Sequence, residues 1–220
     1  MSIKLLGKQS LVYGFGHVIT RLVTFLLLPL YTNQFTPEQY GIVALFYTFV
    51  PLLNIVVRYG MGAAFLKNYV PANKEDRMSI MTNVIISLVL TGIPFLLLFY
   101  FFRENLSLVF FGVVRPSYVV MMGIIIFLDT IWSIPMLALR AENRPRLFIF
   151  FSFLNVGVTL LCNLVFIIVF KMNIGSIFLS NLIASLIIFI LVLPYIYQRF
   201  RFSSLSIVKW KTILSFALPF

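Results

Sequence analysis

Charge is scarce in this sequence, and negative charge is the scarcest. Only 10% of the 220 residues are charged, and six acidic residues stand against 17 lysines and arginines. With 61% hydrophobic residues and a mean hydropathy of +1.06, the chain is far more apolar than a soluble globular domain, of which roughly half is apolar. These values exclude water as the main solvent of the fold.

Cysteine and histidine are almost absent. A single cysteine, Cys162, cannot form a disulfide framework, and we interpret it as a small packing residue. A single histidine, His17, has no second metal ligand close to it in the sequence. We therefore expect no metal site and no cofactor.

Long apolar segments predict an all-α polytopic membrane protein. A spanning helix needs about 20 mostly apolar residues, and lipid offers no partners for free backbone groups. Continuous apolar segments lack the alternation of barrel strands, which favours helices. The sequence predicts six spans: Leu11–Tyr31, Tyr40–Leu66, Met78–Phe102, Ser117–Leu139, Leu147–Phe170 and Gly175–Gln198. Between the first two, residues 36–39 (Thr-Pro-Glu-Gln) predict a capped helix start.

The chain stops inside a further apolar segment that begins near Thr212. We therefore interpret residues 1–205 as an N-terminal six-helix transmembrane lobe, and residues 206–220 as the start of a second lobe. Residues 2–8 and 206–211 provide a similar basic lead-in to a helix, a short match that hints at two similar halves. We expect the sequence to be part of a longer protein.

The basic residues predict the orientation in the membrane. Twelve of the 17 fall in the N-terminus and in alternate connections, where the excess of Lys and Arg marks the cytoplasmic side. Both ends of the chain are thus expected in the cytoplasm. The net charge of +11 is explained by this topology and by attraction to anionic membrane lipids, so no nucleic-acid partner is needed.

Three residues that carry a charge at neutral pH lie inside predicted spans, where each costs about 2.5–3.5 kcal/mol at the helix centre. Arg21 is about ten residues from either end of its span, too deep to snorkel comfortably, and shares a polar face with His17. Arg58 follows Asn54 by one turn and could bind an anion, snorkel or form a structural ion pair. Asp129 could neutralise either arginine or serve as a proton or cation coupling site.

Polar residues also recur at helical spacing in the fifth span, among them Asn155 and Asn163. Such residues are common in contacts between membrane helices, but they could also line a cavity. We therefore name Asn54, Asn155 and Asn163 as candidate sugar contacts, with packing as the alternative role.

The first hairpin resembles the opening of polysaccharide biosynthesis flippases of the multidrug/oligosaccharidyl-lipid/polysaccharide (MOP) exporter superfamily. The resemblance rests on Arg21, on Leu-Pro-Leu-Tyr at residues 28–31 and on Phe-Thr-Pro-Glu-Gln-Tyr-Gly at residues 35–41. Pro51-Leu-Leu-Asn54 leading to Arg58 is similar to the second helix of O-antigen and lipid II flippases. Residues 141–145, Ala-Glu-Asn-Arg-Pro, resemble their connection before the fifth helix.

The resemblance implies one lobe of a two-lobe transporter of the bacterial cytoplasmic (inner) membrane, working in cell-surface polysaccharide biosynthesis. It implies that Arg21 and Arg58 face a cationic cavity and bind the diphosphate of an undecaprenyl-diphosphate-linked oligosaccharide, with His17 beside them. Leucines replace a second first-helix arginine typical of lipid II flippases, which favours another lipid-linked oligosaccharide. A polysaccharide polymerase and chain-length machinery are further candidate partners.

Two other functions remain as alternatives. An ion-coupled multidrug (MATE-type) exporter would favour acidic and aromatic cavity walls, whereas the spans contain one aspartate and two arginines. A membrane glycosyltransferase or polymerase would need acidic residues in an outward loop, and the first such loop offers only Glu38. We therefore expect a transporter and not an enzyme.

Overall fold

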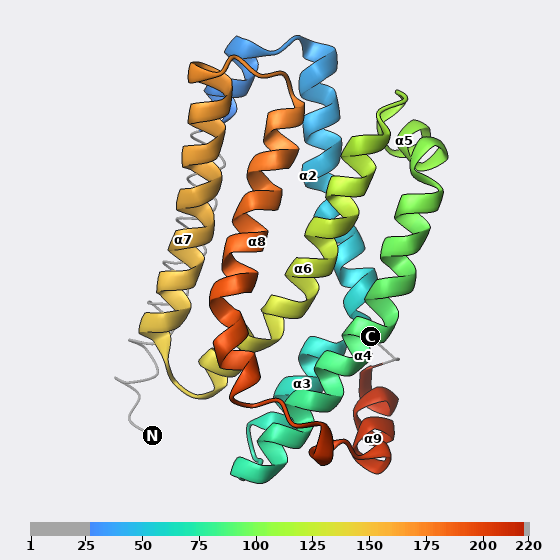
Figure 1. Ribbon diagram of the computed structural model, residues 1–220, viewed down its shortest axis with the longest axis vertical. Coiled ribbons are helices and arrows are strands. Elements are labelled where there is room, and N and C mark those ends of the chain that lie inside the picture. Colours follow the sequence, from blue (N-terminus) through green and yellow to red (C-terminus); the bar gives the residue numbers. More distant parts are fainter. Residues whose placement is uncertain (1–26, 218–220) are drawn as a thin grey trace.

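The computed structural model describes residues 27–217, and this part of the chain is a bundle of long helices without strands (Figure 1). Residues 27–34 are helical. The elements that follow are α2 (Pro37–Arg58), α3 (Met61–Tyr69), α4 (Lys74–Phe101), α5 (Arg103–Phe111), α6 (Pro116–Ala141), α7 (Pro145–Leu164), η1 (Val165–Val169), α8 (Gly175–Tyr197), η2 (Phe202–Ser204) and α9 (Ile207–Ala217).

Five of the described helices are long and apolar enough to cross a membrane: Pro37–Arg58, Lys74–Phe101, Pro116–Ala141, Pro145–Val169 and Gly175–Tyr197. The prediction of an all-α polytopic bundle is confirmed. The first predicted span, Leu11–Tyr31, lies mostly outside the described residues. The helix start before α2 is also confirmed, since Thr36 and Gln39 form a reciprocal capping box with Pro37 in the first turn.

The second predicted span, Tyr40–Leu66, is wrong as a single helix. Tyr59 and Gly60 both adopt positive φ, 33° and 76°, so α2 ends at Arg58 and α3 starts in a new direction. A left-handed conformation is costly for tyrosine and free of that cost for glycine. The Tyr59 hydroxyl lies 2.9 Å from Ser87 Oγ on α4, a contact that holds the strained residue in place.

Helix α6 is the central helix of the lobe and packs against α2, α3, α4, α5, α7 and α8. Buried residues form two large apolar clusters along it. One cluster joins α3, α4, α6, α8 and α9 around Phe65, Leu88 and Ile134. The other joins the helix at residues 27–34 with α2, α6 and α8 around Phe46, Met122 and Phe178.

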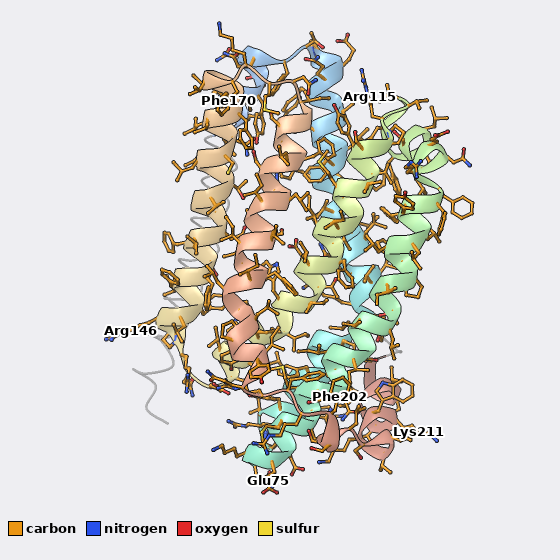
Figure 2. All side chains as sticks on the ribbon, in the orientation of Figure 1. Glu75, Arg115, Arg146, Phe170, Phe202 and Lys211 are labelled. Atoms are coloured by element: carbon orange, nitrogen blue, oxygen red, sulfur yellow. The ribbon has the colours of Figure 1, made fainter. Side chains whose placement is uncertain are left out.

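Basic residues gather at one end of the bundle, called here the basic end, where α3 and α9 lie and where α4 and α7 begin (Figures 1 and 2). Ten of the described lysines and arginines are found there: Lys67, Lys74, Arg77, Arg140, Arg144, Arg146, Arg199, Arg201, Lys209 and Lys211. The opposite end has Arg103, Arg115 and Lys171. This asymmetry corresponds to the excess of lysine and arginine in alternate connections, from which the orientation in the membrane is predicted.

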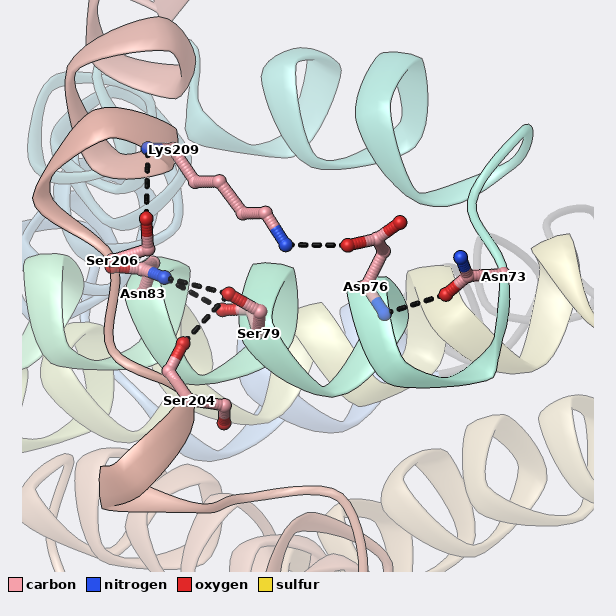
Figure 3. Close-up of polar contacts among 7 residues, drawn as sticks. All are labelled: Asn73, Asp76, Ser79, Asn83, Ser204, Ser206 and Lys209. Atoms are coloured by element: carbon pink, nitrogen blue, oxygen red, sulfur yellow. Dashed lines mark hydrogen bonds and ion pairs between the residues drawn. The ribbon is translucent and has the colours of Figure 1, made fainter.

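The segment between α8 and α9 is fastened to the start of α4 (Figure 3). Ser79 Oγ donates to the main-chain carbonyl of Ser204 at 2.7 Å, and Lys209 pairs with Asp76. Helix α9 then buries Ile213 and Ala217 against α3 and α4. Residues 207–217 therefore pack on the described lobe, and their assignment to a second lobe stays a prediction.

Close contact between α4 and α6 depends on glycine. A Cβ atom at Gly123 on α6 would lie 3.0 Å from Cβ of Phe99 on α4, an atom attached directly to the helix backbone. Phe99 is itself buried. At Gly157 on α7, by contrast, a Cβ atom would meet none of the described residues within 4 Å. The two glycines therefore differ in packing although both lie inside spanning helices.

We expect Gly123→Ala to lower the free energy of unfolding by about 1–3 kcal/mol, the usual cost of overpacking a close contact. Gly157→Ala is the matched control and should be neutral or slightly stabilising, because alanine favours a helix over glycine. Thermal unfolding of both purified variants in detergent measures the difference. Equal melting temperatures would contradict the tight α4–α6 contact.

Candidate functional site

A pocket of about 310 Å³, with polar groups in a largely apolar wall, opens between α2, α6 and α7. Its polar lining comes from Arg58, Ser133, Arg140, Ser152 and Asn155, and aromatic and aliphatic side chains complete the wall. The described lining thus includes two arginines and no carboxylate. A cavity of this composition suits an anionic ligand, because a guanidinium stays charged and offers forked hydrogen bonds to phosphate or carboxylate oxygens.

Arg58 occupies the last position of α2, immediately before the left-handed pair that ends the helix. Its Nη2 donates to the main-chain carbonyl of Asp129 at 3.3 Å. Asp129 lies 13 residues after the start of α6 and 12 before its end, or about 20 and 18 Å at 1.5 Å per residue. The guanidinium therefore sits near half the height of α6, far from either end of that helix.

Arg58 forms no salt bridge with a carboxylate in the described part of the chain, although its charge and that of Asp129 attract each other. The three ion pairs found there all involve Glu142 or Asp76. Moreover, the buried Nε of Arg58 has no hydrogen-bond partner among the described residues. A half-buried guanidinium with an unused donor on the wall of a pocket is poised to bind an acceptor that enters the pocket.

The carboxylate of Asp129 is engaged elsewhere. Its Oδ1 accepts hydrogen bonds from Ser185 Oγ on α8 at 2.6 Å and from Trp132 Nε1 at 2.9 Å. Asp129 thus meets Arg58 through its main-chain carbonyl, while its side chain links α6 to α8 and orients the Trp132 ring. Trp132 in turn lines the pocket.

The three candidate asparagines have different surroundings. Asn155 lines the pocket with Arg58. Asn54 lies one turn before Arg58, is buried, and accepts a hydrogen bond from Thr130 Oγ1 at 3.4 Å. Asn163 is fully buried away from the pocket, where its Oδ1 accepts from the Tyr31 hydroxyl at 3.0 Å and its amide donates to the Thr159 carbonyl. Among these three, only Asn155 contributes to the pocket wall.

His17 and Arg21 lie outside the described residues. Their predicted place beside Arg58 stays a prediction. Among the described residues, no group of three or more His, Cys, Asp or Glu side chains is arranged to hold a metal ion.

Residues 6–220 match the family described as polysaccharide biosynthesis protein. The chain belongs to this family. No curated protein matches it.

Solved structures show which fold this polysaccharide biosynthesis protein has. A multidrug resistance MATE family transporter of the MOP superfamily in an outward-facing conformation superimposes with a TM-score of 0.79 at 15% identity. A MOP superfamily transporter from Pyrococcus furiosus superimposes with a TM-score of 0.78, also at 15% identity. Each match covers 96% of this chain and 51% of the other, so the chain spans about half the length of these transporters.

The segment at residues 141–145, which connects α6 to α7 and resembles the same connection in flippases, has a clear structural role. Glu142 accepts a 2.8 Å hydrogen bond from the Tyr69 hydroxyl, and two from Arg199 after the end of α8. Burial, followed by the contact with Glu142, raises the pKa of Tyr69 to about 12, so the phenol stays a donor. This cluster joins α3, the α6–α7 connection and α8 at the basic end.

Two pocket residues were missed by reasoning from the sequence. Trp132 was not considered, and Arg140 was assigned only to the topology signal. Trp132, Met136 and Arg140 lie on α6 at four-residue spacing and all line the pocket. Arg140 also stacks over Phe148, with its Cζ 5.1 Å from the centre of the ring. The spacing from Asp129 through Ser133 and Met136 to Arg140 was the available signal for a polar stripe on this helix.

We expect Asp129→Asn and Asp129→Ala to differ in stability. The asparagine Oδ1 can still accept from Ser185 and Trp132. The free energy of unfolding of Asp129→Asn should therefore lie within about 0.5 kcal/mol of that of the unchanged protein. Asp129→Ala removes two acceptor contacts and should cost about 1–2 kcal/mol, since such bonds in membranes average about 0.6 kcal/mol and reach about 1.7. Thermal unfolding measures both. If Asp129→Asn is as damaging as Asp129→Ala, the negative charge itself is required and the carboxylate acts as a counter-ion for Arg58.

Proposed function

We propose that the protein is a flippase, or one lobe of one, that moves an undecaprenyl-diphosphate-linked oligosaccharide across the bacterial cytoplasmic membrane for cell-surface polysaccharide biosynthesis. Membership of the polysaccharide biosynthesis family and the fold of half a MOP transporter support this proposal. The observation that carries it is Arg58, whose guanidinium lines a pocket with no carboxylate among its described residues and whose buried Nε has no partner in the described part of the chain.

In the proposed mechanism the diphosphate binds Arg58, and Arg21 and His17 complete the anion site from the first helix. Arg140 lies at the other end of the described pocket wall, toward the basic end, where it can meet the headgroup as it approaches from the cytoplasm. Transport then proceeds by alternating access while the lipid tail remains in the bilayer. Guanidinium suits this task better than lysine, which can lose its proton when it is buried.

The sugar moiety is proposed to meet Asn155 and Ser152, which place polar atoms on the α7 wall of the same pocket. Asn54 stays a secondary candidate because it lies one turn from Arg58. Asn163 is not carried forward, since both ends of its amide are already bonded in the interior. Asp129 is proposed to position Trp132 and, through its carbonyl, Arg58. A coupling role for its carboxylate is the alternative.

Drug export is the second candidate, because MATE transporters share the fold. An organic cation would be repelled by the two arginine charges on this wall, since the described lining includes no carboxylate. The Pyrococcus furiosus transporter is itself described as having a binding pocket of reverse polarity that suggests a different function. The fold therefore accommodates pockets of more than one polarity, and the charge at this pocket favours an anion.

We propose that the N-terminus lies in the cytoplasm, because the excess of lysine and arginine at the basic end marks the cytoplasmic side. Membrane lipids surround the protein, and a polysaccharide polymerase and chain-length machinery are proposed as partners that act after translocation. The protein is proposed to catalyse no covalent step.

The full-length protein should restore oligosaccharide translocation in a strain that lacks its own flippase, and Arg58→Ala should reduce it by about tenfold or more. That loss corresponds to one charge-assisted hydrogen bond of about 1.5–3 kcal/mol. Arg58→Lys should restore only part of the activity, because the ammonium lacks the forked geometry. Arg21→Ala should behave like Arg58→Ala.

Arg146→Ala is the matched control, since Arg146 is exposed at the basic end and points away from the bundle (Figure 2). It should translocate normally at equal expression. Normal translocation by Arg58→Ala would overturn the anion site. Export of cationic drugs, with no effect on the oligosaccharide, would favour the MATE-type alternative.

A further inference from the structure

A second cavity of about 630 Å³ lies between α4 and α8 at the basic end, and its wall is apolar. Its wall is formed by Ile85 of α4, by Phe200 after the end of α8, and by Ile190, Leu193, Pro194, Ile196 and Tyr197 of α8. None of these residues lines the Arg58 pocket. We call this cavity the α4–α8 groove.

The groove runs along the helix axis. Ile190, Leu193, Pro194 and Tyr197 recur at three- and four-residue spacing and form one stripe. From Ile190 to Tyr197 the stripe is about 10 Å long, or a third of the roughly 30 Å hydrocarbon thickness. Ile190 is 53% exposed and Tyr197 85%. An open, apolar channel along the bilayer normal matches the shape and chemistry of a lipid tail.

The last residue that lines the groove, Phe200, is followed directly by a basic residue, Arg201. The main-chain nitrogen of Arg201 donates to Thr82 Oγ1 on α4 at 3.0 Å, and Thr82 is three residues before Ile85. The Arg201 backbone is thus about one helical turn from the groove wall. The Ser79–Ser204 hydrogen bond and the Lys209–Asp76 pair hold the following segment against α4 (Figure 3).

The two arginines at this corner differ in availability. Arg199 is paired with Glu142 at 3.1 Å and stacks 3.7 Å from the centre of the Tyr195 ring. Arg201 is exposed and takes part in none of the ion pairs of the described chain. Its charge is available to an anion at the level of the headgroups, where Tyr197 also provides an amphipathic ring.

We propose that the α4–α8 groove is a binding site for a membrane phospholipid with an anionic headgroup. One acyl chain lies along the stripe from Ile190 to Tyr197, and the phosphate lies at Arg201. An apolar wall excludes sugars and free phosphate as occupants, and the adjacent cation selects negatively charged over zwitterionic headgroups. This site does not depend on which substrate the Arg58 pocket carries.

Native mass spectrometry of the purified full-length protein tests the proposal, with phosphatidylglycerol and phosphatidylcholine of identical acyl chains as probes. Phosphatidylglycerol should bind about fivefold more tightly, the gain expected for one basic residue near an anionic lipid. Arg201→Gln should abolish that preference and leave phosphatidylcholine binding unchanged. Arg146→Gln, at an exposed arginine of the same end, should preserve the preference.

Leu193→Trp tests the groove itself by filling it. It should weaken binding of both lipids by more than about tenfold, as expected when two or more methylenes lose their contacts. Leu191→Trp is the matched control, since Leu191 lies on the same helix, is 44% exposed against 40% for Leu193, and does not line the groove. Melting temperatures establish that the variants are folded, and Arg201→Gln provides the test even if Leu193→Trp is not.

Three results would overturn the proposal. Equal binding of the two lipids by the unchanged protein would show that the site does not select an anionic headgroup. Equal effects of Leu193→Trp and Leu191→Trp would show that the lipid does not bind in the groove. Displacement of phosphatidylglycerol by a small excess of undecaprenyl phosphate would assign the groove to the polyprenyl carrier instead. None of these measurements uses translocation, so they stand apart from the test of Arg58.

Discussion

The hydrogen bond from Arg58 to the main-chain carbonyl of Asp129 is the contact around which this lobe is organised. A guanidinium near the middle of a spanning helix has no water to solvate it and must find acceptors within the protein. Helix α6 provides one acceptor half-way along its length. Oδ1 of the same residue accepts from Ser185 and Trp132, and no salt bridge joins the carboxylate to the arginine among the described residues. The arginine is thus held through a main-chain carbonyl, and the Asp129 charge attracts it without a direct ion pair.

The same place in the chain also determines how α9 is attached. Because Tyr59 and Gly60 turn the chain directly after Arg58, α3 runs toward the basic end and offers its apolar face to α9. Ser87 Oγ accepts from the Trp210 indole at 3.1 Å and contacts the Tyr59 hydroxyl at 2.9 Å. Tyr59, which directly follows Arg58, is therefore connected to α9 through Ser87. A movement of Arg58 on ligand binding would be felt first at this contact.

Sequence patterns predicted the helical class and most helix positions because the bilayer allows few alternatives. The capping box at Thr36–Gln39 was readable since all its partners are local. The break at Tyr59–Gly60 was missed because hydropathy continues unchanged across it, and nothing local distinguishes Gly60 from the packing glycines nearby. Asp129 is a candidate from its central place in a predicted span, and Arg58 from its place inside a span together with the family resemblance. Which atom of Asp129 meets Arg58 could not be predicted, because it depends on how α2, α6 and α8 pack together.

The two cavities differ in the chemistry of their walls. The Arg58 pocket is bounded by α2, α6 and α7 and has polar groups on its wall, whereas the α4–α8 groove is apolar along its whole length. Helix α6, buried between them, separates the two and contributes no residue to the groove. The segment that leads from the groove to α9, and α9 itself, are joined to α4 by the contacts at Thr82, Ser79 and Asp76. The groove and the pocket have no residue in common, so a substitution in one wall leaves the other wall unchanged.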